Sequence, residues 1–466
     1  MTSNFLFIVV DDLNAWIGAL GRHPQTRTPN IDALARRGTL FINAYCSAPY
    51  CNASRMSMFT GKIPSTLGVY HNEPFWDLAD RPLTIMEHLR AGGYKTVGAG
   101  KVFHGVFDYE KALFERLDHA PWKEIENRDL AWTSFQSNVV EPLPRQRPQN
   151  GLFDFSEPDK IDDKYRLLDW GPCDPDQEPH LPDNLTVAAV ERFLEAPGDE
   201  PFFCAAGLYK PHLPWHAPKR FFDLFGEDVV LPLVKADDLD DAPPLAREWA
   251  LSPPDHELVT SRGVWKDAVR AYLACIAYAD DNVGRLLAAL DGSPARDDTT
   301  VILCGDNGYH LGEKLHWRKF ALWEEATRVP LIYVRPNEEP ARVTQPVSLV
   351  DLFPTVLEDA GLDPADSEGF SLTRSRAAAE RTVPVISTWG EGNHSIRTGR
   401  WRYTIYTDGG EELFDHASDP YEWSNLATEA QFDLTRVALK REIEHANRNA
   451  RPRAEVPDAA AANDDG

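Results

Sequence analysis

Short apolar runs alternate with amphipathic helical patterns along most of this chain. The runs rich in Phe, Val and Ile predict buried strands at 5–10, 201–208 and 299–305, and periodic stretches predict helices at 28–38 and 268–290. Helices that alternate with strands favour an α/β fold, in which a mostly parallel sheet is flanked by helices. Ligands bind beyond the carboxyl ends of the strands in such sheets. Polar residues that follow a predicted strand are therefore the first candidates for a functional site.

The pattern becomes irregular in two places and changes style near the C-terminus. Sequence rich in Pro, Asp and Trp predicts an irregular insertion at about 105–180, and an irregular acidic stretch predicts another at about 226–256. Beyond the main α/β domain at 1–375, short strand patterns and one helix predict a small α+β subdomain with an antiparallel sheet at 376–450. The polar end at 451–466 has little to bury, so we expect a disordered tail there.

The composition is strongly acidic. The formal net charge is −25 over 466 residues, of which 42% are hydrophobic. Such a surface repels nucleic acid and anionic lipid, because phosphate binding needs clustered Lys and Arg. No apolar run is long enough to cross a bilayer, and the N-terminal stretch "MTSNFLFIVVDDLN" lacks the basic start of an export signal. We expect a cytoplasmic protein without a nucleic-acid or membrane partner; the C-terminal appendage and exposed aromatic residues allow a homo-oligomer.

Carboxylates follow two of the predicted strands. Asp11 and Asp12 follow the first strand, and Asp306 and Asn307 follow a late one. Each pair alone has an ordinary explanation, because Asp and Asn commonly cap turns and helices. Together they are more informative, since the carboxyl ends of parallel strands meet at one edge of the sheet. Three carboxylates in one cleft repel one another without a cation, and an all-oxygen donor set suits Ca²⁺ or Mg²⁺. We therefore predict a metal site.

Cys51 and Arg55 open the helical stretch "CNASRMSMFTG". Such a helix places Cys51 at its positive N-terminal end, where backbone N–H groups point outward, and Arg55 on the same side one turn later. A thiol in this setting is expected to have a lowered pKa and to be reactive. Simple packing explains Cys204 and Cys304, which lie in apolar strands, better than it explains Cys51, whose neighbours are polar.

Four basic side chains add to these candidates. Lys101 and His104 in "GAGKVFHG", His212 in "YKPHLPWHAP" and Lys319 in "LHWRKF" each follow or approach a predicted strand end. Lys101 and His104 are close enough along the chain to reach one anion. A lone histidine is more often structural than catalytic, and we assign the structural role to His71, His180, His216, His256 and His394.

Together, these motifs resemble the type I sulfatases, and most of all their iduronate-2-sulfatase-like branch. The motifs are Asp-Asp after the first strand, C-x-x-S-R opening a helix, G-K-x-x-H, K-P-H-x-P, a late D-N-G-Y-H-L-G-E and the ending "ELFDHASDPYEWSNLA". The resemblance spans residues 4 to about 445. It implies an alkaline-phosphatase-like fold and one Ca²⁺ per chain, with Mg²⁺ or Mn²⁺ as substitutes. It also implies a cysteine that a maturase converts to formylglycine, whose hydrate is the nucleophile.

The resemblance assigns roles to particular residues of this chain. The implied metal ligands are Asp11, Asp12, Cys51, Asp306 and Asn307. The implied catalytic residues are Cys51, Arg55, Lys101, His104, His212 and Lys319. Cys51 would become formylglycine, and Lys101, His212 and Lys319 would bind the substrate. His104 would take the proton from the second hydroxyl of the hydrate, and His212 would assist the leaving oxygen. Fixed cations and a metal suit this reaction, because a sulfate ester gains negative charge on its leaving oxygen in the transition state.

One position departs from the usual C-x-P-S-R signature. Ala53 stands where proline is expected, which alters the extended peptide that the converting enzyme recognises. The family includes alanine here, particularly where a radical-based maturase acts. We predict hydrolysis of a sulfate monoester, either a sugar sulfate or another small organic sulfate such as choline sulfate. The alternatives are a phosphodiesterase or phosphonate monoester hydrolase on the same scaffold, and a non-catalytic anion-binding protein with an unmodified Cys51.

Overall fold

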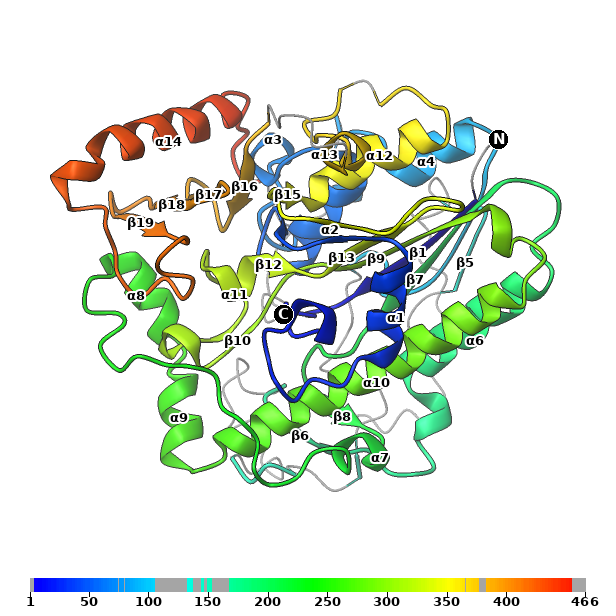
Figure 1. Cartoon of the computed structure of the whole chain (residues 1–466), viewed down its shortest axis with the longest axis horizontal. Helices are drawn as coiled ribbons and strands as arrows, with labels where there is room; N and C mark the ends of the chain where they lie inside the picture. Colours follow the sequence, from blue (N-terminus) through cyan, green and yellow to red (C-terminus); the bar gives the residue numbers. More distant parts are fainter. Residues whose placement is uncertain are drawn as a thin grey trace.

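A mixed sheet crosses the centre of the protein, with helices on both faces (Figure 1). The computed structural model describes residues 4–73, 75–78, 80–104, 132–136, 144–145, 149–152, 167–364, 366–376 and 383–454. Within these residues the sheet has eight strands, in the order β14 (Ala341–Val343), β2 (Thr39–Phe41), β13 (Leu331–Val334), β9 (Thr299–Gly305), β1 (Asn4–Val10), β7 (Phe202–Leu208), β4 (Lys95–Gly100) and β5 (Ser134–Gln136). β1 runs parallel to β7 and β9, whereas β13 is antiparallel to β9 and β2. The predicted α/β fold with a mostly parallel sheet is confirmed.

The helices of the described residues and the short outer strands surround this sheet. The helices are α1 (Pro29–Arg37), α2 (Cys51–Thr60), α3 (Pro64–Leu67), α4 (Ile85–Ala91), α6 (Pro182–Glu195), α7 (Lys219–Phe222), α8 (Pro244–Leu251), α9 (Asp255–Ser261), α10 (Trp265–Asp291), α11 (Glu324–Thr327), α12 (Leu352–Asp359), α13 (Leu372–Arg376) and α14 (Asp433–Ala446). The outer strands pair as β3 (Ala44–Tyr45) with β12 (Arg328–Val329) and β15 (Val347–Ser348), β10 (His310–Leu311) with β11 (Trp317–Arg318), and β6 (Trp170–Pro172) with β8 (Trp215–Ala217).

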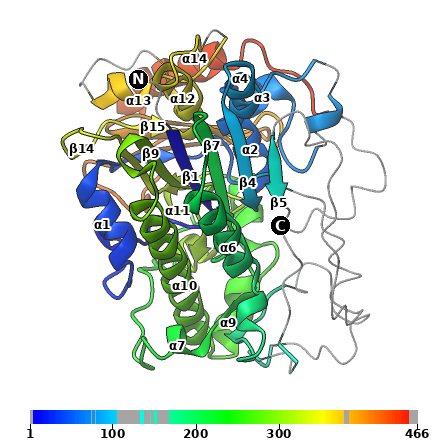
Figure 2. The same cartoon turned by 90° about the vertical axis from the view of Figure 1, so that its right-hand side faces the viewer.

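The central strand β1 is apolar on both faces because helices cover both. Its even-numbered residues, Leu6 to Val10, pack into one core with α1, α6 and α10. Its odd-numbered residues, Phe5 to Val9, pack into a second core with α2, α4 and α12. Figure 2 shows α6 and α10 running side by side along one face of the sheet. This double burial explains the unbroken apolar run that predicted the strand.

The C-terminal subdomain is a separate antiparallel sheet covered by α14. Its strands follow one another in the order β16 (Val385–Thr388), β17 (His394–Arg397), β18 (Trp401–Ile405) and β19 (Glu411–Asp415). Leu439 and Ile443 of α14 pack on this sheet, as predicted for this part of the chain. At the start of the predicted tail, the backbone N–H of Arg451 donates to the carbonyl of Ser65 at 2.7 Å. The rest of the predicted tail, 455–466, lies outside the described residues.

The two predicted insertions contain more regular structure than expected. In the first, the described residues form β5 and β6, and most of the remainder lies outside the described residues. In the second, the structure has neither helix nor strand from 226 to 243, but α8 begins at Pro244. The apolar residues Ala246 and Ala250 of α8 are buried, so long-range packing forms a helix where the sequence is rich in Pro and Asp. No helix in the described part of the chain is both long and apolar enough to span a membrane.

Candidate active site

The two predicted pairs of strand-end residues meet at one edge of the main sheet. β1 and β9 are parallel neighbours in which Val10 lies opposite Gly305, so Asp11 and Asp306 follow at the same level. The backbone N–H of Asp12 donates to Asp306 Oδ1 at 3.0 Å. Asp12 has a φ of 56°, a left-handed conformation that Asp tolerates better than most residues. All of these carboxylates are buried, which confirms that the strand ends bring them together.

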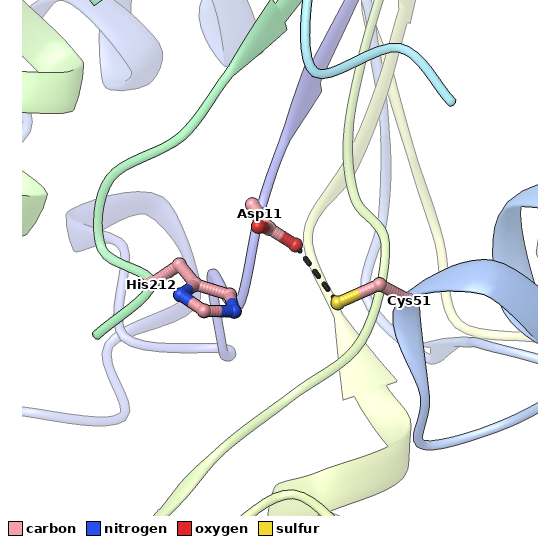
Figure 3. A group of neighbouring side chains, drawn as sticks. All are labelled: Asp11, Cys51 and His212. Carbon is pink, nitrogen blue, oxygen red and sulfur yellow. Dashed lines mark hydrogen bonds between the residues drawn. The ribbon is translucent and has the colours of Figure 1, made fainter. Parts of the chain in front are cut away.

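Cys51 is the first residue of α2 and faces the same carboxylates. Its Sγ atom lies 3.1 Å from Asp11 Oδ1, as Figure 3 shows. One ligand atom from each of Asp11, Asp12, Cys51 and Asp306 lies within 4.8 Å of the others. Cys51 is only 1% exposed, so the helix N-terminus presents it to the inside of the protein.

Arg55 holds two of the carboxylates in place. Its Nε donates to Asp306 Oδ2 at 2.8 Å, and its Nη2 donates to Asp11 Oδ1 at 3.2 Å. Its Nη1 donates to the carbonyl of Val102 at 3.0 Å, which ties α2 to the loop that follows β4. Ser54, for which the sequence predicted no separate role, donates through Oγ to the carbonyl of Asp306 at 2.5 Å. Its place inside the C-x-x-S-R motif was the signal that could have identified it.

The two predicted lysines also reach this centre. Lys101 follows β4, and its Nζ forms an ion pair with Asp11 Oδ2. Lys319 follows β11, and its Nζ lies 2.8 Å from both Asp12 Oδ1 and Cys51 Sγ. Both side chains are buried. With Arg55, they supply three cations that balance three carboxylates.

The two predicted histidines lie in the same region, and their own rings are uncharged. His212 Nδ1 donates to the carbonyl of Leu213 at 2.5 Å, so its Nε2 faces the centre, 3.9 Å from Asp12 Oδ2; the ring is drawn in Figure 3. Burial, and then the positive charge of Lys101, lowers the pKa of His212 to about 3. The same two causes lower the pKa of His104 well below its usual value. His104 Nδ1 is buried without a hydrogen-bond partner.

The expectation of a lowered Cys51 pKa is wrong. Burial, and then the Asp11 carboxylate beside the sulfur, raises the pKa of the thiol well above its usual value. The Lys319 and Lys101 ammonium groups oppose this shift in the pKa but do not outweigh it. All six cysteines are buried, so burial does not distinguish Cys51, whereas its contacts with Asp11 and Lys319 do.

The centre has the features of a cation site built from oxygen. Burial, opposed by Arg55 and reinforced by Asp11 and Asp12, raises the pKa of Asp306 to about 7. Asn307 Nδ2 donates to Asp12 Oδ1 at 2.7 Å, while Asn307 Oδ1 is buried without a donor. A cation would stabilise the Asp306 carboxylate and satisfy the amide oxygen. Carboxylate and amide oxygens are the ligands that Ca²⁺, Mg²⁺ and Mn²⁺ prefer, so the residues present fit such an ion.

Solved structures with the same arrangement of elements are hydrolases. A phosphonate monoester hydrolase of Agrobacterium radiobacter superposes with a TM-score of 0.74 and 20% identity, covering 96% of this chain and 95% of that one. A 2-O GAG sulfatase superposes with a TM-score of 0.69 and 21% identity, covering 96% and 93%. These likenesses show that the protein has an alkaline-phosphatase-like fold.

The sequence comparisons show which family the chain belongs to. The model of the Sulfatase family matches residues 3–362, and the chain belongs to this family. A sulfatase of Formosa agariphila is 34% identical, over 94% of this chain and 85% of that protein. The choline-sulfatase of Rhizobium meliloti is 30% identical over 94% and 84%, and human iduronate 2-sulfatase is 28% identical over 77% and 69%. The protein is a sulfuric ester hydrolase.

Proposed function

We propose that the protein hydrolyses the sulfate monoester of a small organic alcohol, with a formylglycine residue made from Cys51 and one Ca²⁺ ion. The observation that carries the proposal is the position of Cys51 Sγ, which lies 3.1 Å from Asp11 Oδ1 and 2.8 Å from Lys319 Nζ. A side chain at this position contacts both the metal-ligand carboxylates and a cation able to bind sulfate. The names of the relatives support sugar sulfates and choline sulfate as candidate substrates.

The charges of the centre favour an anionic substrate once a metal is bound. Asp11, Asp12, Asp306 and Asn307 would hold the ion, and Cys51, once modified, would face it. The three carboxylates are already balanced by Arg55, Lys101 and Lys319, so a divalent ion leaves an excess of two positive charges. A buried excess of this sign attracts a sulfate ester. When bound, the metal would act as a Lewis acid toward the sulfate oxygens.

The remaining catalytic roles belong to side chains of the protein itself. Hydrated formylglycine supplies a geminal diol, in which one hydroxyl is a nucleophile and the other is an acid. Lys101 and Lys319, on flexible stems, would neutralise the charge that develops on the sulfate oxygens. His104 would accept a proton at its unpartnered Nδ1. His212 Nδ1 already donates to a carbonyl, so its Nε2 becomes a proton donor when the sulfate anion raises the pKa of the ring.

The proposal also implies a maturase that modifies Cys51 before the chain folds. Cys51 and Ala53 are buried within α2, where an enzyme that binds an extended peptide cannot reach them. The maturase would therefore act on the unfolded segment. We further propose that this happens in the cytoplasm, which the free thiols of Cys46, Cys51, Cys204 and Cys304 support.

The test is the mass of the peptide that carries Cys51, measured on protein from a host with a maturase and from a host without one. We expect a mass that matches the aldehyde or its hydrate in the first sample, together with turnover of an aryl sulfate. Only an alkylatable thiol in both samples would contradict the formylglycine proposal.

A phosphonate monoester hydrolase is the second candidate, because such an enzyme superposes on this fold with a TM-score of 0.74. Sulfate and phosphonate esters are tetrahedral anions of similar size, so similar sites accept them. Values of kcat/KM on matched aryl sulfate, phosphate diester and phosphonate esters separate the two activities. We expect the aryl sulfate to have the highest value.

A further inference from the structure

Three aromatic side chains from distant parts of the chain meet beside the active site. Tyr50 directly precedes Cys51, Phe320 directly follows Lys319, and Trp389 follows β16 in the C-terminal subdomain. Their ring centroids lie 5.2 to 5.6 Å apart, and the angles between their planes are 19° to 35°. We call Tyr50, Phe320 and Trp389 the aromatic platform.

The platform begins at the position where sulfate would bind. Lys319 Nζ lies 2.8 Å from Cys51 Sγ and 6.0 Å from the centroid of the Phe320 ring. Tyr50 is buried, but Phe320 and Trp389 both keep part of their surface exposed. Residues that only fill a core would be covered completely. An accessible apolar surface therefore lies directly beside the reaction centre.

The turn that carries Trp389 is held firmly against the main domain. The backbone N–H of Thr388 donates to the carbonyl of Ser47 at 2.8 Å, just before the segment that leads into α2. Asn393 Nδ2 donates to the carbonyl of Trp389 at 3.0 Å, and Asn393 Oδ1 accepts from the backbone N–H of Thr407 at 2.9 Å. Trp389 is thus positioned before any ligand binds, which lowers the entropy that binding costs.

The arrangement of the rings indicates which alcohol they suit. A cage for a quaternary ammonium ion needs aromatic faces that surround a gap. The platform rings instead contact one another at small angles, and His71 and Trp249 pack on Trp389 in steeply inclined contacts at 4.6 and 6.3 Å. The parts of Phe320 and Trp389 that stay exposed are apolar ring surface, which matches the C–H face of a pyranose ring, whose hydroxyls remain free at its edge. The apolar contact and the ring stacking both favour such a ligand.

We propose that the aromatic platform is the subsite for the alcohol part of the substrate and that it selects a sulfated sugar ring over choline sulfate. This inference rests on the proposed sulfatase function of the same site. It assigns the C-terminal subdomain a direct part in specificity, because that subdomain supplies Trp389.

The test compares Trp389→Ala with Trp401→Ala as a matched control. Trp401 lies on the same C-terminal sheet and packs on Phe432, away from the platform. We expect the wild type to hydrolyse at least one positional isomer of galactose monosulfate. For that ester, Trp389→Ala should lower kcat/KM by about 10-fold or more, as the loss of one aromatic stacking contact predicts. Trp389→Phe should recover most of the loss, and Trp401→Ala should match the wild type.

Choline sulfate, which contains no sugar ring, is the comparison substrate. We expect Trp389→Ala to leave its low turnover unchanged. An equal loss of kcat/KM on both esters would show a structural role for Trp389. A wild-type preference for choline sulfate that disappears in Trp389→Ala would show a cation site. Each result overturns the proposal.

A binding measurement separates this inference from the proposed chemistry. The same galactose monosulfate is titrated by calorimetry into Cys51→Ala, which cannot form formylglycine, and into Cys51→Ala/Trp389→Ala. We expect binding only by the first protein, or at least 10-fold tighter binding by it. If the wild type turns over no sulfate ester and yet this difference holds, the proposed function fails and the sugar subsite stands. Equal binding by both proteins would overturn the subsite.

Discussion

Two buried clusters of charged side chains hold carboxylates close enough together to ligate an ion, and they differ in how those carboxylates are satisfied. One is the reaction centre around Asp11, Asp12 and Asp306. The other, which we call the arginine cluster, contains Glu324, Glu422, His416, Arg397 and Arg402. Ligand atoms of its two glutamates and its histidine lie within 4.8 Å of one another, as those of the reaction centre do.

In the arginine cluster, every carboxylate oxygen has a partner. Arg402 donates to Glu324 Oε2 at 2.6 Å and to Glu422 Oε1 at 2.5 Å. The other two oxygens accept from the Tyr45 hydroxyl and from the backbone N–H of Glu324. Despite burial, the charge of Arg402 and the hydrogen bond from His416 hold the pKa of Glu422 at about 2. The cluster thus stabilises its own charges and leaves nothing for a metal to satisfy.

The reaction centre contains a similar number of charges but leaves one buried oxygen without a donor and one carboxyl group with a raised pKa. Burial and the neighbouring carboxylates raise the pKa of Asp306 to about 7, and Asn307 Oδ1 has no donor. Two of its three cations are lysines, whose flexible stems can turn toward a ligand, whereas the arginine cluster uses planar guanidinium groups that fix their partners. The reaction centre is therefore the cluster of the two in which a bound cation has an oxygen left to satisfy.

The largest expected effect is that of Cys51→Ala. The variant removes the proposed nucleophile from the reaction centre, so kcat on an aryl sulfate should fall by about 10⁴-fold or more. Cys204→Ala is the control, because Cys204 is equally buried but lies inside β7 without a charged neighbour. It should keep its activity. Steady-state kinetics on matched preparations measure both, and a Cys51→Ala enzyme with more than a tenth of the wild-type kcat would remove Cys51 from the mechanism.

The second-largest effect is expected from metal removal, to which the reaction centre should respond and the arginine cluster should not. Treatment with a chelator should lower kcat by about 10²-fold or more, and added Ca²⁺ should restore it. Asp12→Asn should abolish Ca²⁺ binding in a calorimetric titration, and asparagine tolerates the positive φ of this position. Glu422→Gln is the control in the arginine cluster and should bind Ca²⁺ like the wild type. Loss of Ca²⁺ binding in Glu422→Gln, with normal binding in Asp12→Asn, would reverse our assignment of the two clusters.

The strand-end residues of the reaction centre could be predicted from the sequence, because two short-range signals suffice for them. An apolar run that ends in Asp11 predicts a strand and its carboxyl end, and a parallel sheet brings such ends together. The helix that starts at Cys51 and the position of Arg55 one turn later follow from the helical period. The structure confirms this geometry, down to the bonds from Arg55 to Asp11 and Asp306.

The raised pKa of Cys51 could not be predicted, because it depends on the packing of distant segments. All ten residues of α2 are buried, and the docking of the C-terminal sheet on the segment before Cys51 contributes to this burial. The platform residue Trp389 was missed for the same reason. Trp215 and Trp317, by contrast, are core residues, exposed by 0% and 1%.

A substitution in the arginine cluster should lower the stability of the protein and leave catalysis nearly unchanged. Arg402→Met leaves Glu324 and Glu422 buried without their main partner, which should lower the free energy of unfolding by about 3–5 kcal/mol. Urea unfolding measures this loss. The kcat of the folded fraction should stay within about twofold of the wild type, because no atom of the cluster contacts the reaction centre. The double variant Arg402→Met/Glu422→Gln should recover part of the loss, and a larger loss than that of the single variant would contradict an unpaired-charge explanation.

The smallest effect we expect is a difference in acid sensitivity. The pKa of Glu422 falls from its usual 4.5 to about 2 on folding, so the unfolded chain takes up a proton at this residue first as the pH drops. The stabilisation that Glu422 provides is therefore complete above about pH 4.5 and is lost as the pH falls through its folded pKa. Glu422→Gln removes the titrating group. Between about pH 6 and pH 3 its free energy of unfolding should thus decline by about 2 kcal/mol less than that of the wild type. Urea unfolding at each pH measures both slopes, and parallel curves for the two proteins would mean that Arg402 does not hold Glu422 charged.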